Sequence, residues 1–389
     1  MQSENKISKI PSGINKHYIV EMPTSTEKKI LIDFFKQAYS DQFNAPYHQN
    51  EEEIVKRWDW YNVKNPNVRN KQSTSWICKV RKTGKIVGHC GIIPALLKHK
   101  DTCSSIAWGR DFIVLPEFRK LGIGPFLLDS VLKKIKNEIS LFLIAGGNEE
   151  VFKIYKKLGF VDLGYIPLYV RMVRIDNILK NKLTNQLVAH SLGFVGKGVL
   201  NILHTASFMQ SIKYRKQETA IEEIFNFDDS LDELWKSASC SLPLIIKRDI
   251  ASLKWRFIEQ PYWKYRIFKA LNENGKKTKG YIVLRKGKSR GFNVGIISDL
   301  FAASWDIQTI FSLVNFAVKY FEEKGDIDLV KCNILNKNFE FVLKKLGFMN
   351  MASSSRFMIT NITEPLNSTL VSNRNNWFIN CADSDLDLY

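Results

Sequence analysis

The chain has 389 residues, with 57 Lys or Arg against 39 Asp or Glu, so its formal net charge is +18. This length suggests two or three domains, and a hydrophobic content of 45% excludes a largely disordered chain. The positive charge indicates an anionic partner, without choosing among phosphate groups, nucleic acid and an acidic membrane.

The six cysteines are scattered without a Cys-x-x-Cys pair, so we expect neither a disulfide framework nor a metal site. The first residues lack the apolar core of a signal peptide, and no uncharged apolar run is long enough to span a bilayer. These features favour a cytoplasmic protein.

Strand-like and helix-like segments alternate through the first 175 residues, which predicts an α/β domain. Strands are indicated by runs of apolar and β-branched residues, and helices by an apolar face. In chain order we expect a strand at 17–22, helices at 28–39 and 51–61, strands at 76–81, 85–93 and 105–114, a helix at 125–137, a strand at 141–146 and a helix ending at Leu158-Gly159-Phe160.

Residues 177–217 contain six Lys or Arg and no Asp or Glu. Their apolar middle is interrupted by Lys197, and a lysine at a bilayer centre costs about 2.5–3.5 kcal/mol, so a spanning helix is not expected. Two alternatives stay open: a linker helix docked on the protein, and an interfacial helix in peripheral contact with the inner face of the membrane.

The second half of the chain repeats the first. The sequence Lys-Lys-Leu-Gly-Phe occurs at 156–160 and again at 344–348. Further matches keep the same order along the chain: Asn148 with Asn336, Asp111 with Asp299, and Trp60 with Trp255. Two copies of one fold are therefore predicted. We expect an N-terminal domain at 1–175, a basic helical linker at 176–217, a second domain at 218–362 and a C-terminal tail at 363–389.

The most informative segment is 108–132, which predicts a strand, a turn and a helix. The turn carries Arg119, Gly122 and Gly124 in the pattern R-x-x-G-x-G. Glycine lets the backbone approach a ligand, so amides at the start of a helix can bind an anion such as pyrophosphate. The alternative is a strand-to-helix turn that needs glycine only for its geometry.

This segment resembles motif A of the GNAT superfamily of N-acetyltransferases, whose glycine turn binds the pyrophosphate of acetyl-CoA. The next motif of the family is also present, as Asn148, Tyr155 and Gly159-Phe160. The resemblance covers about 17–172. It implies an α/β fold with two tandem GNAT-like domains, each a mixed, mostly antiparallel sheet flanked by helices.

The resemblance also assigns roles to residues. It implies that acetyl-CoA, or another acyl-CoA, is the cosubstrate. Tyr155 would protonate the departing thiolate, although it could instead pack as a core tyrosine. Asn148 would contact the pantetheine arm. The backbone of Phe112, Ile113 and Val114 would pair with that arm, and the pyrophosphate would be held by the amides of Arg119, Lys120, Leu121, Gly122, Ile123 and Gly124.

The general base is less defined by the sequence. Asp111 is the first candidate for the group that deprotonates the amine, with His89 second. The alternative for Asp111 is a structural salt bridge with Arg110, and the matching Asp299 in the second copy strengthens that alternative. His89 lies among apolar residues and could be an ordinary core histidine.

The second copy has lost the residues that would bind and transform CoA. Arg119, Gly122, Gly124 and Tyr155 correspond there to Ile307, Ile310, Ser312 and Leu343. We therefore expect the second domain to bind no CoA, and to shape the acceptor site or contact a partner.

The acceptor is indicated only by weaker patterns. Trp58, Trp60 and Tyr61 could stack on a sugar or pack in a core. Residues 249–268 and 377–389 are similar to segments of tandem GNAT proteins encoded among surface-polysaccharide genes. The closing aspartates are either a solvated tail or lie near the acceptor amine: Asp383, Asp385 and Asp387.

The sequence thus favours an N-acyltransferase that moves an acetyl or short acyl group from acyl-CoA to a primary amine by direct attack. The expected acceptor is an amino sugar, as a small molecule or glycan precursor, in surface-glycan synthesis. The alternatives are a Fem-type aminoacyltransferase using aminoacyl-tRNA, and a non-catalytic GNAT-like scaffold. No feature requires nucleic acid as a partner.

Overall fold

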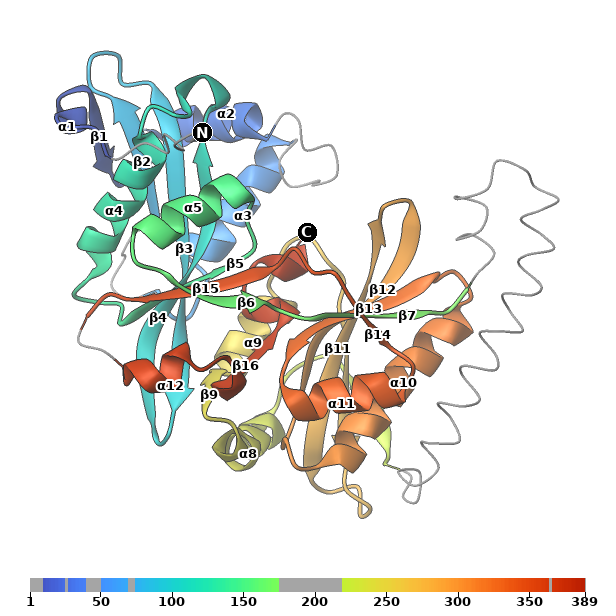
Figure 1. Ribbon diagram of the computed structural model, residues 1–389. Coiled ribbons are helices and arrows are strands. Elements are labelled where there is room, and N and C mark those ends of the chain that lie inside the picture. The colour runs from blue at the N-terminus through green and yellow to red at the C-terminus, as the bar shows by residue number, and fades with distance from the viewer. Residues whose placement is uncertain are drawn as a thin grey trace, which may run out of the picture.

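The computed structural model describes residues 10–24, 27–39, 50–68, 74–174, 219–363 and 366–388. In these residues the chain forms two halves whose strands join into one continuous sheet of 16 strands (Figure 1). The basic stretch at 177–217 lies outside the described residues, so both alternatives for it stay predictions.

The first half is a mixed sheet with helices on both faces. Its neighbouring strands run antiparallel except β4 and β5, which are parallel because helix α4 crosses between them. Helices α4 and α5 pack on one face and α2 and α3 on the other. The strands are β1 (Tyr18–Glu21), β2 (Ser75–Val80), β3 (Ile86–His99), β4 (Thr102–Val114), β5 (Leu141–Ala145) and β6 (Val161–Tyr165). The helices are α1 (Ile14–His17), α2 (Lys28–Ala38), α3 (Glu51–Asn62), α4 (Ile123–Ile135) and α5 (Glu149–Lys157).

The second half repeats this order of elements, again with one parallel pair, β12 and β13. The mixed α/β class predicted from the sequence is confirmed. The strands are β8 (Ile221–Ile224), β10 (Arg266–Leu271), β11 (Thr278–Ser289), β12 (Phe292–Ala302), β13 (Leu329–Leu335) and β14 (Met349–Met351). The helices are α8 (Asp229–Ala238), α9 (Ile250–Phe257), α10 (Ile307–Lys324) and α11 (Lys337–Lys345).

One strand is exchanged in each direction between the halves. Strand β7 (Leu168–Met172) follows the first half along the chain but pairs with β13 and β14 of the second. Strand β15 (Arg356–Asn361) follows the second half but pairs with β5 and β6 of the first. In Figure 1, β15 lies on the left beside β5 and β6 of the first half, and β7 lies on the right beside β13 and β14 of the second. The domain boundaries expected near 175 and 362 stay predictions, but strands next to both are shared between the sheets.

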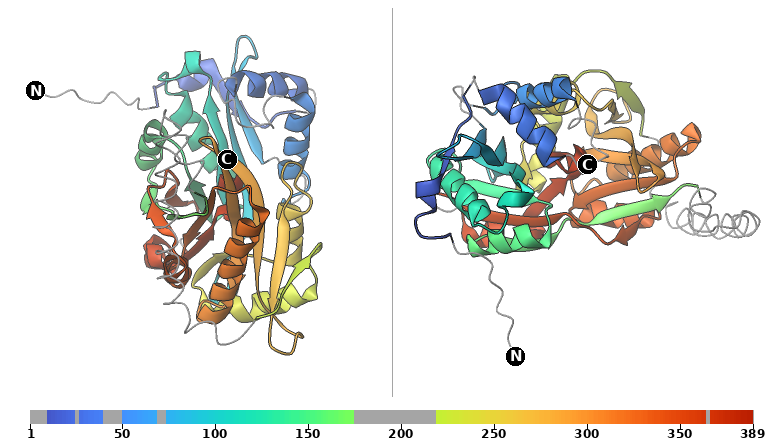
Figure 2. Two further views of the ribbon diagram at one scale, coloured as in Figure 1. Left: turned by 90° about the vertical axis from the view of Figure 1, so that its right-hand side faces the viewer. Right: turned by 90° about the horizontal axis from the view of Figure 1, so that it is seen from above.

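Two short strands join the halves. Strand β9 (Leu244–Ile246) pairs with β3, and β16 (Trp377–Asn380), which follows helix α12 (Ser368–Ser372), pairs with both β9 and β13. Figure 2 shows from two further sides that the C-terminal segment stays in the middle of the molecule. The segment expected as a C-terminal tail is thus part of the continuous sheet.

The tryptophans that recur in the two halves meet at the centre. The Nε1 of Trp60 on α3 donates to the Trp255 carbonyl, and the Nε1 of Trp255 on α9 donates to the Trp60 carbonyl, both at 2.9 Å. Their rings stack with centroids 4.8 Å apart. Tyr61 is also fully buried in this core, which favours the core-packing interpretation of Trp60 and Tyr61 over sugar stacking.

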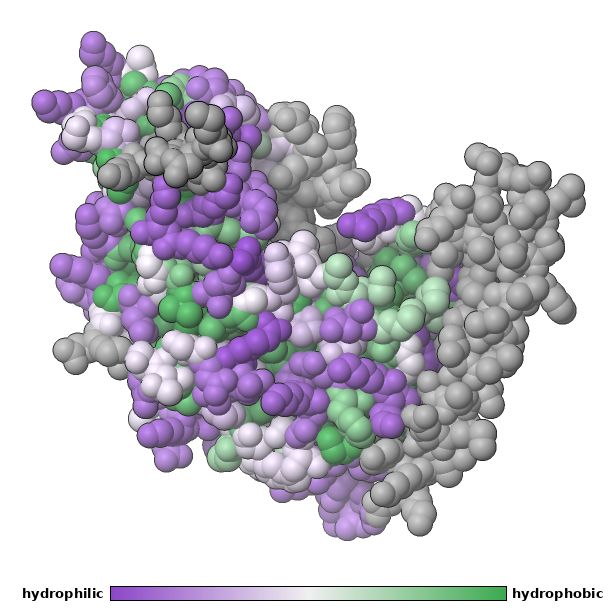
Figure 3. Space-filling model, in the orientation of Figure 1, coloured by the Kyte–Doolittle hydropathy of each residue, from purple (hydrophilic) through white to green (hydrophobic). Residues whose placement is uncertain are grey.

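The surface is mostly hydrophilic on the face shown in Figure 3, where hydrophobic side chains form only small patches. Exposed hydrophobic side chains occur on the short strands β6 and β14, for example Val161, Met349 and Met351. Single exposed apolar residues of this kind are common in folded proteins.

Candidate active site

The predicted pyrophosphate-binding turn connects β4 to α4. A 3-10 helix at Pro116–Phe118 leads into it, and both Lys120 and Gly122 have left-handed backbones, with φ of 64° and 83°. Gly122 is the N-cap of α4, and no side chain caps this helix. Because the first amides of an α-helix have no intrahelical acceptor, those of Ile123 and Gly124 are suited to bind an anion.

Beside this turn, β4 and β5 diverge. They pair only where Ile106–Trp108 lies against Leu141–Leu143. Beyond that point no described strand pairs with Phe112–Val114 on the β5 side, so an extended ligand could pair with this backbone edge. One backbone carbonyl of this edge already has a partner: that of Val114 accepts a hydrogen bond from Arg119 Nε at 2.9 Å.

Tyr155 projects from α5 into the core beneath β4. Its ring packs against Phe160, with centroids 5.0 Å apart, and lies 6.0 Å from that of Phe112. Burial raises the pKa of Tyr155 well above its ordinary value, and the negative charge of Asp385 contributes. The phenol therefore stays protonated at neutral pH, as a proton donor to a thiolate must.

Asn148 caps helix α5. Its Oδ1 accepts a hydrogen bond from the Val151 amide at 3.0 Å. Asn336 caps α11 in the same way, accepting from the Asn338 amide at 3.0 Å. The cap is therefore a feature of both halves, and it accounts for the recurrence of asparagine without a ligand. A contact between Asn148 and pantetheine stays a prediction.

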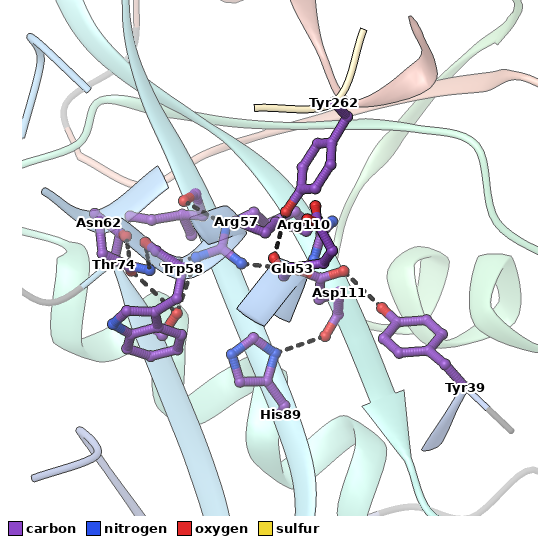
Figure 4. Close-up of polar contacts among 12 residues, drawn as sticks. Tyr39, Glu53, Arg57, Trp58, Asn62, Thr74, His89, Arg110, Asp111 and Tyr262 are labelled. Carbon is purple, nitrogen blue, oxygen red and sulfur yellow. Dashed lines mark hydrogen bonds and ion pairs between the residues drawn. The ribbon is translucent and has the colours of Figure 1, made fainter. Parts of the chain in front are cut away.

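Asp111 lies at a bulge of β4 and has a left-handed backbone, with φ of 47°. Its carboxylate accepts hydrogen bonds from Tyr39 Oη at 2.6 Å and from Nη1 of both Arg57 and Arg110 at 2.7 Å (Figure 4). Burial opposes its ionisation, but the two guanidinium groups outweigh burial and hold its pKa well below the ordinary value. A carboxylate so occupied is a poor proton acceptor, which favours its structural alternative.

His89 lies behind Asp111 on β3. Its Nδ1 is 2.9 Å from the backbone oxygen of Asp111 (Figure 4). Its ring contacts the Phe35 ring edge-on, with centroids 4.9 Å apart. Burial lowers the pKa of His89 to about 4, and the charge of Arg110 adds to the effect. The side chain has no exposed surface, so His89 fits the core histidine that the sequence left as an alternative.

The closing aspartates are buried, so their interpretation as a solvated tail is wrong. Asp383 accepts hydrogen bonds from Arg248, at 2.8 and 2.9 Å, and Asp387 accepts from Arg285 Nε at 3.0 Å. Asp385, between them, is 8% exposed. The apolar residues just before this segment were the one indication in the sequence, because they form the buried strand β16.

Within the described ranges, no group of three or more His, Cys, Asp or Glu side chains is placed to hold a metal ion. No helix in the described part of the chain is long and apolar enough to cross a membrane.

Comparisons with known proteins give one family match and several solved structures of similar fold. The model of the acetyltransferase (GNAT) family matches residues 32–160, which include the glycine turn, Asn148 and Tyr155. Residues 32–160 form a GNAT acetyltransferase family domain. A search by sequence among curated proteins finds no match.

Solved structures share the fold over most of the chain. A GCN5-related N-acetyltransferase from Anabaena variabilis is 14% identical, with a TM-score of 0.57, over 89% of this chain and 73% of its own. Saccharomyces cerevisiae N-myristoyltransferase with bound myristoyl-CoA is 12% identical, with a TM-score of 0.57, over 91% of this chain and 86% of its own. At such low identity these likenesses show a shared fold alone, and the share of this chain that they cover shows that the likeness extends across both halves.

Proposed function

We propose that this chain is an N-acyltransferase that moves an acetyl or short acyl group from acyl-CoA to a primary amine. The observation that carries the proposal is the uncapped start of α4 at Gly122, next to the unpaired edge of β4. An anion site and an unpaired strand edge, side by side, suit a ligand with a pyrophosphate and an extended amide-bearing arm. The myristoyl-CoA bound by the yeast structural neighbour supports a CoA donor.

The residues then take distinct roles. The amides from Arg119 to Gly124 hold the pyrophosphate, and the backbone of Phe112–Val114 pairs with the pantetheine arm. The amine attacks the thioester carbon directly, and Tyr155 gives its proton to the departing thiolate. Burial keeps Tyr155 protonated until that step.

The acceptor we propose is an amino sugar in surface-glycan synthesis, as the similarity of 249–268 and 377–389 to tandem GNAT proteins implies. The second half, without a glycine turn, would form the other wall of the acceptor site. Activity in the cytoplasm, with peripheral membrane contact through 177–217, completes the proposal.

Activity is tested with purified full-length protein, acetyl-CoA and a panel of amines that includes glucosamine, galactosamine, lysine and spermidine. Thiol release should depend on an amine and be fastest with an amino sugar. Tyr155→Phe should lower kcat by about 100-fold or more, as expected for loss of a proton donor. The matched control is Tyr165→Phe on β6, which removes a phenol hydroxyl from an exposed tyrosine and should leave kcat unchanged.

Other outcomes discriminate the alternatives. If no amine is acetylated and Tyr155→Phe changes nothing, the protein is a binding scaffold. If aminoacyl-tRNA is consumed and acetyl-CoA is not, the protein is a Fem-type transferase.

A further inference from the structure

Three aspartates alternate along the last segment of the chain, and the outer two fix it to the second half. Asp383 is bound by Arg248. Asp387 is bound by Arg285 Nε at 3.0 Å and by Ser298 Oγ at 2.9 Å, and it also accepts from the Tyr265 hydroxyl. Both carboxylates are therefore held by arginines, and the segment between them has a defined position.

Asp385 lies at the junction of the two halves. The carbonyl of its neighbour Ser384 accepts a hydrogen bond from Arg256 on α9. On the other side, Leu386 Cδ2 is 3.5 Å from the place that a Cβ would take on Gly146, directly after β5. Asp385 is thus held next to the end of β5, where β5 diverges from β4.

Resting on the proposed function, we infer that Asp385 is the group that removes a proton from the acceptor amine. Tyr155, the proposed proton donor, has two electrostatic neighbours that raise its pKa, Cys90 and Asp385. Cys90 is buried, which raises its pKa to about 12, so it is no acceptor of protons from an amine at neutral pH. Asp111 and His89 are excluded by their contacts and burial, as described above.

The surroundings of Asp385 suit this task. Burial raises its pKa to about 6, the charge of Asp111 adds to this, and Arg57 and Arg256 oppose it. The carboxyl is therefore mostly ionised at neutral pH, yet takes up a proton more readily than an ordinary aspartate. The ionisable groups that face it come from five elements: Asp111 of β4, Arg57 and Tyr61 of α3, Arg256 of α9, Tyr155 of α5 and Tyr39 at the end of α2.

Tyr61 and Arg256, both in this group, each have a buried polar atom without a hydrogen bond. Tyr61 Oη and Arg256 Nη1 are buried and have no hydrogen-bond partner among the described residues. An unsatisfied buried donor is costly, so unpaired atoms of this kind mark places where a polar ligand group is accommodated. Their position next to Asp385 favours a polar acceptor there over an apolar one.

The acceptor nitrogen loses two protons in the reaction, and each has a defined acceptor. The ammonium group of the acceptor gives one proton to the Asp385 carboxylate, which passes it to solvent. The neutral nitrogen attacks the thioester carbon, the C–N bond forms and the C–S bond breaks. The thiolate takes the proton of Tyr155, and the second proton lost from nitrogen restores the phenol. The products are an amide, free CoA thiol and one released proton.

The test uses full-length Asp385→Asn, with acetyl-CoA and glucosamine as probes, and Asp326→Asn as the matched control on the exposed surface. Asp385→Asn should lower kcat by about 100-fold or more, with its acetyl-CoA affinity, measured by calorimetry, unchanged. In the wild type, kcat/KM should fall as the pH drops below about 6, and this inflection should vanish in Asp385→Asn. Asp326→Asn should keep both the rate and the inflection.

Each contrary result has one meaning. If Asp385→Asn keeps the wild-type rate, or keeps the inflection near pH 6, Asp385 is not the proton acceptor. If the wild type itself neither binds acetyl-CoA nor acetylates any amine of the panel, the proposed function fails, and this inference with it.

Discussion

Helices α4 and α10 begin at matching places in the two halves, and they differ in whether an anion can bind there. Helix α4 begins at a glycine without a side-chain cap. Helix α10 follows Asp306, whose carboxylate accepts hydrogen bonds from the Thr309 amide at 3.1 Å and the Thr309 hydroxyl at 2.9 Å. The chain's own carboxylate thus stands where a phosphate would bind, and its charge would repel one. Of these two helices, only α4 begins without a side-chain cap, so its first amides are free of a side-chain acceptor.

The gap between the parallel strands shows the same contrast. In the second half, Val294–Ile297 of β12 pairs with Leu329–Cys332 of β13. Beyond this, β13 pairs with β16, and Asn380 Nδ2 of β16 donates to the Leu300 carbonyl of β12 at 3.0 Å. In the second half, β16 therefore fills the gap between β12 and β13. The matching edge of β4 in the first half has no such strand beside it among the described residues. Binding of CoA in the second half is opposed at both places.

Features shared by the two halves belong to the fold instead. Asp111 and Asp299 recur, and each is buried and bound by arginine and tyrosine side chains: Tyr39, Arg57 and Arg110 for Asp111, and Arg248 and Tyr281 for Asp299. Because the second half keeps this buried carboxylate although it has no glycine turn, the interaction is explained by the fold without a role in substrate binding. This comparison separates structural residues from candidates for chemistry, and substitutions in matching pairs can test it.

The largest expected effect is on Asp111. Asp111→Asn leaves two buried arginines, Arg57 and Arg110, without the carboxylate that binds them. Removing one partner of a buried ion pair costs about 3–5 kcal/mol, and we expect a loss of unfolding free energy of this size, measured by urea denaturation. Asp299→Asn should cost less, because Arg248 keeps its ion pair with Asp383. A stable Asp111→Asn with a large loss of activity would instead restore Asp111 as the base.

Substitution of Asp385 should have the opposite effect and stabilise the fold. Its pKa is raised from 3.8 to about 6 in the folded chain, so the folded state loses stability as the pH rises through this interval. Asp385→Asn should therefore raise the free energy of unfolding by about 3 kcal/mol above pH 6, and have no effect below 3.8. Thermal unfolding at pH 8 and pH 3.5 checks this. Equal stability of the two proteins at pH 8 would contradict a buried carboxylate with a raised pKa.

The smallest expected effect is on the two helix caps. Asn148→Ala and Asn336→Ala should each lower the free energy of unfolding by about 1 kcal/mol, the usual loss for an N-cap. If Asn148 also contacts pantetheine, only Asn148→Ala should weaken acetyl-CoA binding. Calorimetry and denaturation of both variants measure the two effects. An equal change of affinity in both would count against a ligand contact.

The local elements were predictable from the sequence because short-range patterns determine them. The amphipathic helix expected at 125–137 lies at 123–135, and the turn before it has the left-handed glycine that its motif implies. The repeat also predicted which half lacks the turn. These features depend on neighbours along the chain.

The long-range features were not predictable. Strand β7 alternates between buried and half-buried residues, whereas β15 has a buried apolar centre, and nothing in either sequence specifies a partner in the opposite half. The burial of Asp383 and Asp387 depends on Arg248 and Arg285, which lie more than a hundred residues away along the chain. Without knowledge of these arginine partners, a segment with several aspartates is expected to be exposed to solvent.

The central claim is that the first half binds acyl-CoA at the glycine turn and the second half does not. Calorimetric titration with acetyl-CoA tests it most directly, using the wild type, Gly122→Trp and the control Gly325→Trp. Gly325 is matched to Gly122, because it has a left-handed backbone at the end of α10 and no atom near its Cβ position. We predict one acetyl-CoA per chain, lost in Gly122→Trp and kept in Gly325→Trp. Two bound molecules per chain, or undiminished binding to Gly122→Trp, would contradict the account.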